Sequence, residues 1–536
     1  MALQQYAPAV TVTRGTQTVT RSWAHNPHTR EVLTASRNDV LQEAPPTIDD
    51  DGNHTFSIAE GPFSLWERRV TMTDDTITEH TSYRIDIPWF GWVFALPILR
   101  FVRRSGSANP ATSSPIGKVP WWAPPDRLNA RQVMILGLLA AAAMSSAFTN
   151  TVFTQTVTFA ADDFGVGNTG VGIAGALVRA GILITIPLAI AGDRVGRRKV
   201  VVAMAWAAPI VTATGALAPN FPLLVATQSI GRPLGLALDF LIAVIAAEEM
   251  PRGSRAYAVG IMAMASGLGA GVAVMALPLT DISPSGWRWV FAITLVWLVI
   301  AVDIARRLPE SKRFIQPHAE HIPLHRRRFF TLAAILVGVN LLVAPASFFQ
   351  NRYLSEVRHL SGSAIALFSL ATATPAALGL IIGGRAADRR GRRRLIAISL
   401  PFAALLIVAS FSIGGAPMWI TAFGGGLLGG VAYPALAVYR AELFPTGNRS
   451  RAAGLLTVAA LLGGIGGLLG AGALLDQGWD YRSVMGVLMV GQLIAVVLVL
   501  TGLPETAQRE LEDISSDESS GSTASSGFRK DASGLR

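Results

Sequence analysis

Charged side chains are rare in the long apolar stretches of this chain, and three of them have the spacing of a shared site. Arg179 lies about four helical turns before Asp193, and Arg232 lies about four turns before Glu248. Both guanidinium groups therefore fall at a similar depth, a pairing suited to a carboxylate or phosphate. Asp239 follows Arg232 by two turns on the same helical face and about 10 Å deeper, where it is placed to carry a proton.

A charge inside a membrane-spanning helix is costly unless it is paired or hydrated, so each of these residues is a candidate for substrate binding or proton coupling. The alternative is a structural ion pair between Arg179 and Asp239. Four uncharged polar residues of the apolar stretches are further candidates: Asn150, Gln155, Asn340 and Tyr433. Their alternative role is to hydrogen-bond a neighbouring helix.

Two short strings recur at nearly constant offset. Gly192 to Lys199 and Ala387 to Arg394 both have the form D-R-x-G-R-R-K/R, and each follows an apolar run. The elements Glu248-x-x-Pro251-x-x-x-Arg255 and Pro309-Glu310-Ser311 return as Glu442-x-x-Pro445-x-x-x-Arg449 and Pro504-Glu505-Thr506. The apolar part of the chain therefore consists of one unit used twice in the same orientation.

Composition indicates a membrane protein. Hydrophobic residues make up 51% of the 536 residues and charged residues only 15%, too few to cover a soluble protein of this size. Cysteine is absent, which excludes disulfides and thiolate chemistry. The net charge of +10 comes from arginines beside apolar stretches, so the anionic face of a membrane explains it better than nucleic acid. No cleavable signal peptide is visible.

Twelve apolar windows are long enough to cross a bilayer. They cover approximately residues 132–159, 169–191, 200–218, 222–247, 256–279, 287–306, 329–351, 363–386, 395–413, 417–441, 452–475 and 483–503. The linkers after even-numbered windows carry the arginine clusters, whereas those after windows 1, 3 and 9 carry no lysine or arginine. The positive-inside rule then places both termini in the cytoplasm of a multi-pass protein of the cell membrane, plasma or inner.

These windows predict an all-α membrane protein with two pseudo-symmetric six-helix bundles, 131–306 and 329–503. A cytoplasmic loop, 307–328, joins them, and residues 504–536 form a disordered cytoplasmic tail. Residues 1–130 form a small cytoplasmic extension with some β-structure, including two strands within residues 65–87 that are joined by a turn. Its apolar segment 88–102 is too short to span and predicts an interfacial or re-entrant element.

With these patterns, residues 131–514 resemble the major facilitator superfamily. The D-R-x-G-R-R-K strings after windows 2 and 8 resemble that superfamily's most specific motif, and Pro309-Glu310-Ser311 and Pro504-Glu505-Thr506 resemble elements of its sugar-porter-like and metabolite–proton symporter branches. The glycine-proline motif of antiporters is absent from window 5.

The resemblance implies a cytoplasmic gate that works as a conformational switch. In the family, the motif aspartate faces the first turn of a helix of the opposite half, and motif arginines pair with the glutamates after windows 4 and 10. The corresponding residues here are Asp193, Arg197, Glu248, Arg255, Asp388, Arg392, Glu442 and Arg449. Arginines that only fix topology are the alternative.

The resemblance implies secondary active transport of a small polar solute, and the membrane arginines suggest an anionic one, moved by alternating access with proton symport. Proton-coupled efflux of drugs or metabolites is the alternative, and a transporter-like receptor is a third hypothesis. An enzyme is not expected, because the chain has no G-x-S-x-G motif and no P-loop. The expected partners are the solute, protons and the lipid bilayer, with no nucleic acid, no metal and no cofactor, and the protein is expected to work as a monomer.

Overall fold

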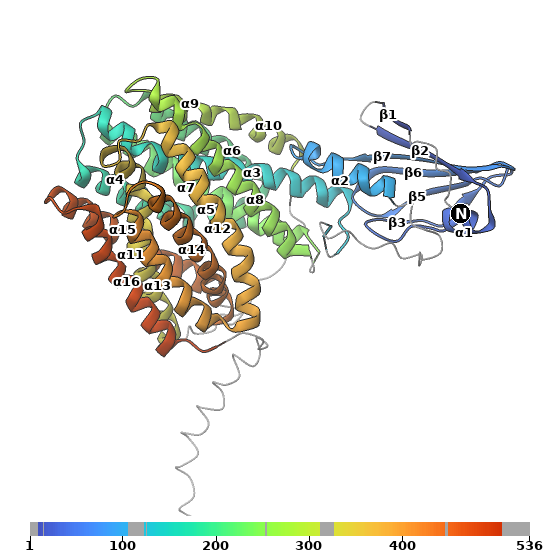
Figure 1. Ribbon diagram of the computed structural model, residues 1–536. Helices are drawn as coiled ribbons and strands as arrows, with labels where there is room; N and C mark the ends of the chain where they lie inside the picture. Colours follow the sequence, from blue (N-terminus) through green and yellow to red (C-terminus); the bar gives the residue numbers. More distant parts are fainter. Residues whose placement is uncertain are drawn as a thin grey trace, which may run out of the picture.

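The computed structural model describes residues 9–13, 16–104, 123–124, 126–251, 254–310, 326–444 and 449–505 (Figure 1). The tail that the sequence predicts to be disordered lies almost wholly outside these residues, as does most of the predicted central loop. The described chain forms a β-rich N-terminal part and a large helical part, joined where α2 and the start of α3 meet (Figure 1).

The N-terminal part is a single antiparallel sheet with the strand order β1-β2-β7-β6-β5-β3, and β4 pairs with β5. The strands are β1 (Ala9–Thr13), β2 (Thr16–Ala24), β3 (Gln42–Glu43), β4 (Thr47–Ile48), β5 (His54–Glu60), β6 (Phe63–Met72) and β7 (Thr76–Ile85). The hairpin predicted within residues 65–87 is the β6–β7 pair. The sequence did not predict the strands on either side of it.

Two helices cover one face of this sheet. Leu33 of α1 (Pro27–Thr34) packs in a cluster with Trp23 and Phe56, and Ile98 and Val102 of α2 (Gly91–Arg104) pack in a second cluster on the sheet. Side chains on the same face alternate with outward polar ones, as the two-residue period of a strand requires.

The buried face also carries charges. Arg68 of β6 is buried between Glu43 and Glu79, with nitrogen–oxygen distances of 2.6 and 3.6 Å, and Arg21 of β2 reaches Glu79 at 3.0 Å. Trp66 donates a hydrogen bond to Glu43. Each buried charge in this cluster has at least one opposite charge beside it, which offsets its loss of hydration.

The helical part consists of α3 to α16. Its helices are α3 (Ala130–Asp163), α4 (Asn168–Ala180), α5 (Thr185–Val195), α6 (Arg197–Ala213), α7 (Phe221–Glu249), α8 (Arg255–Met275), α9 (Trp287–Ala292), α10 (Leu298–Arg307), α11 (Arg326–Glu356), α12 (Gly362–Arg390), α13 (Arg392–Ser410), α14 (Ala416–Glu442), α15 (Arg449–Asp476) and α16 (Tyr481–Gly502). Short 3-10 segments join α4 to α5 and α9 to α10, and another extends α8 through Leu277–Asp281.

Within the described residues, eleven helical stretches are long and apolar enough to cross a membrane. The second predicted span differs from these because it is interrupted. The 3-10 turn Gly181–Ile184 separates α4 from α5, so the three pieces together take the place of one continuous helix. A 3-10 stretch within a helix often marks a hinge or strain.

Two bundles result, α3 to α10 and α11 to α16. In the first, α3 packs on α7 and α8; in the second, α11 packs on α15 and α16, and α12 packs on α13 and α14. The two bundles meet mainly where α4 lies along α15. This contact is close because Gly172 and Gly472 bring the two backbones together: a β-carbon at either glycine would come within 2.7 Å of a carbonyl oxygen of the other helix.

Candidate transport site

The repeated motifs define two ends of the helical part. We call the end that carries the D-R-x-G-R-R loops the basic side and the opposite end the far side. Since α3 begins next to the N-terminal part and successive spans alternate in direction, α3, α11 and α15 run from the basic side to the far side. The candidate residues lie between these two ends.

Arg179 and Arg232 lie where α4 and α7 are both irregular. Arg179 stands just before the 3-10 turn of the second span, and Arg232 stands just before Pro233 inside α7. The two irregular segments pack on each other, because a β-carbon at Gly181 would come within 2.4 Å of the Ser229 carbonyl. The two guanidinium groups are near enough to repel each other.

Arg179 also reaches the second bundle. A β-carbon at Gly464 of α15 would lie 2.9 Å from a guanidinium nitrogen of Arg179. Among the described residues, neither Arg179 nor Arg232 forms an ion pair with a carboxylate within 4 Å, and the pairing of Arg179 with Asp239 that the sequence left open does not occur. The structure therefore holds two neighbouring cations, and one of them, Arg179, lies against the second bundle.

Asp239 belongs to a separate polar group on α3 and α7. Ser146 of α3 lies within hydrogen-bonding reach of the Asp239 carboxylate and donates to the Gly235 carbonyl at 2.7 Å. Asn150, one turn further along α3, donates to Ser146 at 3.2 Å. Two candidates from the sequence are thus brought together by a serine that the sequence did not single out.

The other polar candidates do not join this group. Asn340 bonds a carbonyl of its own helix, α11, and Tyr433 of α14 is 59% exposed. Gln155 of α3 accepts a hydrogen bond from Asn351 of α11 at 2.9 Å, which links the two bundles near the far side. Of these three, Gln155 has the role of an interhelical contact in this conformation.

Two matched carboxylates connect the bundles on the far side. Asp476, at the end of α15, accepts backbone N–H bonds from Asn168 and Thr169 at the start of α4, at 3.0 and 2.7 Å. Asp281, at the end of the segment that follows α8, accepts them from Gly362 and Ser363 at the start of α12, at 2.6 and 2.9 Å. Each bundle therefore caps a helix N-terminus of the other, where an anion is electrostatically favourable. We call these contacts the far-side caps.

The basic side shows a second pair of matched carboxylates, here within each bundle. Glu310 accepts the backbone N–H of Arg198 at 3.1 Å, and Glu505 accepts those of Arg392 and Arg393 at 2.9 and 3.1 Å. The two glutamates of the repeated P-E-S and P-E-T elements thus cap α6 and α13, the helices that follow the repeated basic motifs.

The motif glycines make these caps possible. Gly196 and Gly391 have φ angles of +110° and +93°, which L side chains rarely adopt. A β-carbon at Gly196 would also lie 3.1 Å from Glu310, and one at Gly391 would lie 2.8 Å from Glu505. The glycine at this motif position therefore allows the backbone to adopt a positive φ angle and leaves room for the carboxylate to reach the helix N-terminus.

Part of the predicted gate is described. Arg197 forms an ion pair with Glu248 at the end of α7, the pairing that the resemblance implies, and the Arg392 side chain is buried. The side chains of the remaining gate residues lie outside the described part: Asp193, Arg255, Asp388, Glu442 and Arg449.

Comparison with known proteins decides the family. The family model described as Major Facilitator Superfamily matches residues 138–371 and 330–532, which together span well over half of the chain. The chain belongs to the major facilitator superfamily. It is accordingly a multi-pass membrane transporter and not an enzyme.

Solved structures of transporters share the fold. A bacterial homolog of the human lysosomal transporter Spinster, inward-facing and unoccupied, matches with 19% identity and a TM-score of 0.57, over 69% of this chain and 97% of that one. The xylose transporter XylE from E. coli, inward open, matches with 15% identity and a TM-score of 0.60, over 72% and 99%. The nucleoside transporter NupG, solved as a point mutant, matches with 12% identity and a TM-score of 0.56, over 68% and 100%.

For this member of the superfamily, sequence reasoning missed the residues of the far-side caps. The signal was present, because Asp281 and Asp476 are separated by the same offset as the aspartates of the basic motifs, Asp193 and Asp388. Small polar residues such as Ser146 carry no comparable signal, since serine is common in apolar helices.

Proposed function

We propose that this transporter moves a small polar, anionic organic solute by alternating access, with proton symport. The observation that carries the proposal is the pair Arg179 and Arg232. Two neighbouring guanidinium groups that have no carboxylate partner among the described residues are costly in a membrane, and a bound anion would offset that cost. Because Arg179 lies against Gly464 of the second bundle, an anion bound to Arg179 would lie close to the contact between the two bundles.

Asp239 is the proposed proton carrier. Its carboxyl group lies beside Ser146 and Asn150 and without an ion-pair partner in the described part of the chain. A protonated carboxyl group can donate one hydrogen bond and is electrically neutral, so loading a proton removes an uncompensated charge from the span. Loading and release of this proton would then accompany the change between states.

The far-side caps support alternating access. They contribute hydrogen bonds from helix N-termini to the contact between the bundles on the far side, and such bonds can break when the bundles rock. We assign the far side to the outside of the cell and the basic side to the cytoplasm, since arginine-rich loops are retained in the cytoplasm. The described contacts then correspond to a conformation closed toward the outside. The Arg197–Glu248 pair is already formed in this conformation, within the first bundle.

The test of the anion site is transport of pooled organic anions, sugars and organic cations by protein reconstituted in liposomes. Arg179→Gln and Arg232→Gln each remove charge-assisted hydrogen bonds and should weaken the apparent affinity for the transported anion about tenfold or more. Arg306→Gln, at an exposed arginine of α10, is the matched control and should leave affinity unchanged. Unaltered anion affinity in both span variants would refute the site.

A further inference from the structure

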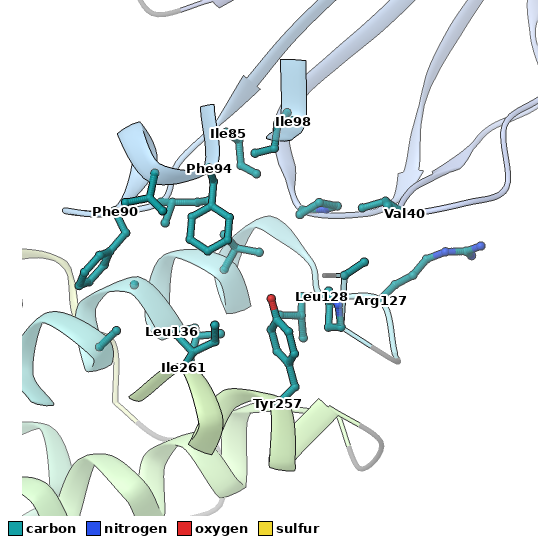
Figure 2. A pocket seen from close by; sticks show the side chains of 18 of the residues that line it. Val40, Ile85, Phe90, Phe94, Ile98, Arg127, Leu128, Leu136, Tyr257 and Ile261 are labelled. Carbon is teal, nitrogen blue, oxygen red and sulfur yellow. The ribbon is translucent and has the colours of Figure 1, made fainter. Parts of the chain in front are cut away.

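A cavity of about 560 Å³ lies between the N-terminal part and the first bundle (Figure 2). Three helices contribute one face each. On α8, Tyr257, Ile261, Ala265 and Leu268 line it, at the three- and four-residue spacing of a single helical face. The size falls within the range of about 300–1,000 Å³ that is typical of ligand pockets.

The opposite wall comes from the N-terminal part. Phe90, Phe94, Ile98 and Phe101 line the cavity from α2 and its start, again at helical spacing, and Leu136 of α3 lies beside Ile261 (Figure 2). Figure 2 shows Phe94 and Ile261 on opposite sides of the space. The walls are therefore mainly aromatic and aliphatic.

The N-terminal part is fixed against the first bundle around this cavity. Arg127, just before α3, donates to the Asp39 carbonyl at 3.0 Å, and Trp89 donates to Asp303 of α10 at 3.0 Å. A β-carbon at Gly137 of α3 would lie 2.6 Å from Pro88, so this glycine admits the segment that leads into α2. The cavity is thus part of a docked arrangement rather than a gap between loosely joined units.

One side of the cavity continues onto an exposed apolar surface of a spanning helix. Met264 and Leu268 line the cavity, belong to the span formed by α8, and are 70% and 58% exposed. Val93 of α2 lines the cavity as well and is 45% exposed. In a bilayer, the mouth between α2 and α8 therefore opens toward hydrocarbon.

The outer face of α2 is suited to the membrane surface. Trp92 is 80% exposed and Leu96 is 53% exposed, on the side away from the buried Ile98 and Val102. Exposed tryptophan and leucine on an amphipathic helix next to a span are typical of an interfacial helix. A lipid beside α2 would have its acyl chain at the mouth of the cavity.

The polar lining is concentrated at one end. Asp39, Glu60, Asp126 and Arg127 line the cavity there. The Asp39 carboxylate pairs with Arg37 at 2.8 Å, and Glu60 lies 4.0 Å from Arg127. The Tyr257 hydroxyl points into the space (Figure 2). This end of the cavity is therefore polar, and suits the head-group region of a lipid better than its acyl chain.

We propose that this cavity binds an acyl chain of a membrane phospholipid from the leaflet on the basic side, admitted between α2 and α8, with the head group at the polar end. The chain would fill an apolar space that is costly to leave filled with water. The site is separate from the transported solute and depends only on the chain spanning a bilayer.

Photochemical cross-linking of the full-length protein tests this proposal. The protein is placed in nanodiscs of equal parts phosphatidylethanolamine and phosphatidylglycerol, with a trace of phosphatidylethanolamine that carries a diazirine at the end of one acyl chain. We expect cross-links to concentrate on the cavity-facing residues of α2 and α8, above those on other exposed apolar surfaces of the spans, such as that around Ile420, which is 69% exposed.

Substitutions that fill the cavity with a larger side chain test the same proposal, with a matched control. Ile261→Trp places an indole in the space, and displacing even two methylene groups of the chain should lower cross-linking there about tenfold. Val259→Trp, on the same turn of α8 but on an exposed face outside the lining, should leave cross-linking unchanged. Leu136→Trp repeats the test from α3 should Ile261→Trp not yield monodisperse protein.

Two results would overturn the proposal. Cross-linking of the cavity that persists in both filled variants, or that never exceeds the labelling around Ile420, would show that no acyl chain enters.

Discussion

Removing the far-side caps should open the far side of the transporter. Asp281→Ala and Asp476→Ala each delete a carboxylate that holds two backbone N–H groups of the opposite bundle. Both aspartates are exposed, so we take the value typical of a helix N-cap, about 1 kcal/mol each. One variant should then shift the equilibrium between the closed and open far side about fivefold, and the double variant, at about 2 kcal/mol, about thirtyfold.

The absence of cysteine makes the assay direct. Single cysteines at Ser285 and Gln477, one in each bundle beyond the caps, can carry spin labels with no background labelling. The distance distribution between the labels should gain a longer component in each single variant, and this component should dominate more strongly in the double variant.

Asp480→Ala is the control. Asp480 also caps a helix on the far side, but it accepts from Ser483 of its own bundle, so its loss should leave the distances unchanged. If the double variant reproduces the wild-type distribution, or if Asp480→Ala opens the far side equally, the caps do not hold the bundles together.

Two further predictions concern the motif glycine and the N-terminal part. Gly196→Ala should lower stability by about 1–3 kcal/mol because alanine must adopt a φ of +110° beside Glu310, whereas Gly260→Ala, in open space on α8, should not, as thermal unfolding will show. Burial alone would raise the pKa of Glu43, but the hydrogen bonds and charge of Arg68 hold that pKa below its usual value. Since the folded pKa is the lower one, this stabilisation is complete above the unfolded pKa and is lost as pH falls through the folded value. Amide exchange in β5–β7 of the full-length chain should therefore speed up below about pH 4, and unaltered protection there would contradict the assignment.

The helical part could be predicted from the sequence because its signals are local. The sequence alone shows each of them: apolar windows of spanning length, basic loops on alternate linkers, and motifs repeated at a constant offset. The interruption at Gly181–Ile184 could not be read in this way, since it depends on how this turn packs against Ser229 and Pro233 of α7.

The sheet of the N-terminal part was harder to predict because its buried face is not uniformly apolar. Arg21 and Arg68 point inward to Glu79 and Glu43, so the alternation of apolar and polar residues is broken in β2 and β6. The candidate site was predicted in part: Arg179 and Arg232 do lie near each other, while Asp239 lies with Ser146 through contacts that only the packing of α3 on α7 creates.

The most direct test of the central claim is solute-dependent proton movement in proteoliposomes that contain a pH-sensitive dye. An added organic anion should carry protons inward together with the solute in the wild-type protein, and Asp239→Asn should abolish the proton flux. Protons that leave as solute enters would indicate antiport, saturable binding without flux would indicate a receptor, and proton-coupled uptake that survives in Asp239→Asn would contradict the assigned proton carrier.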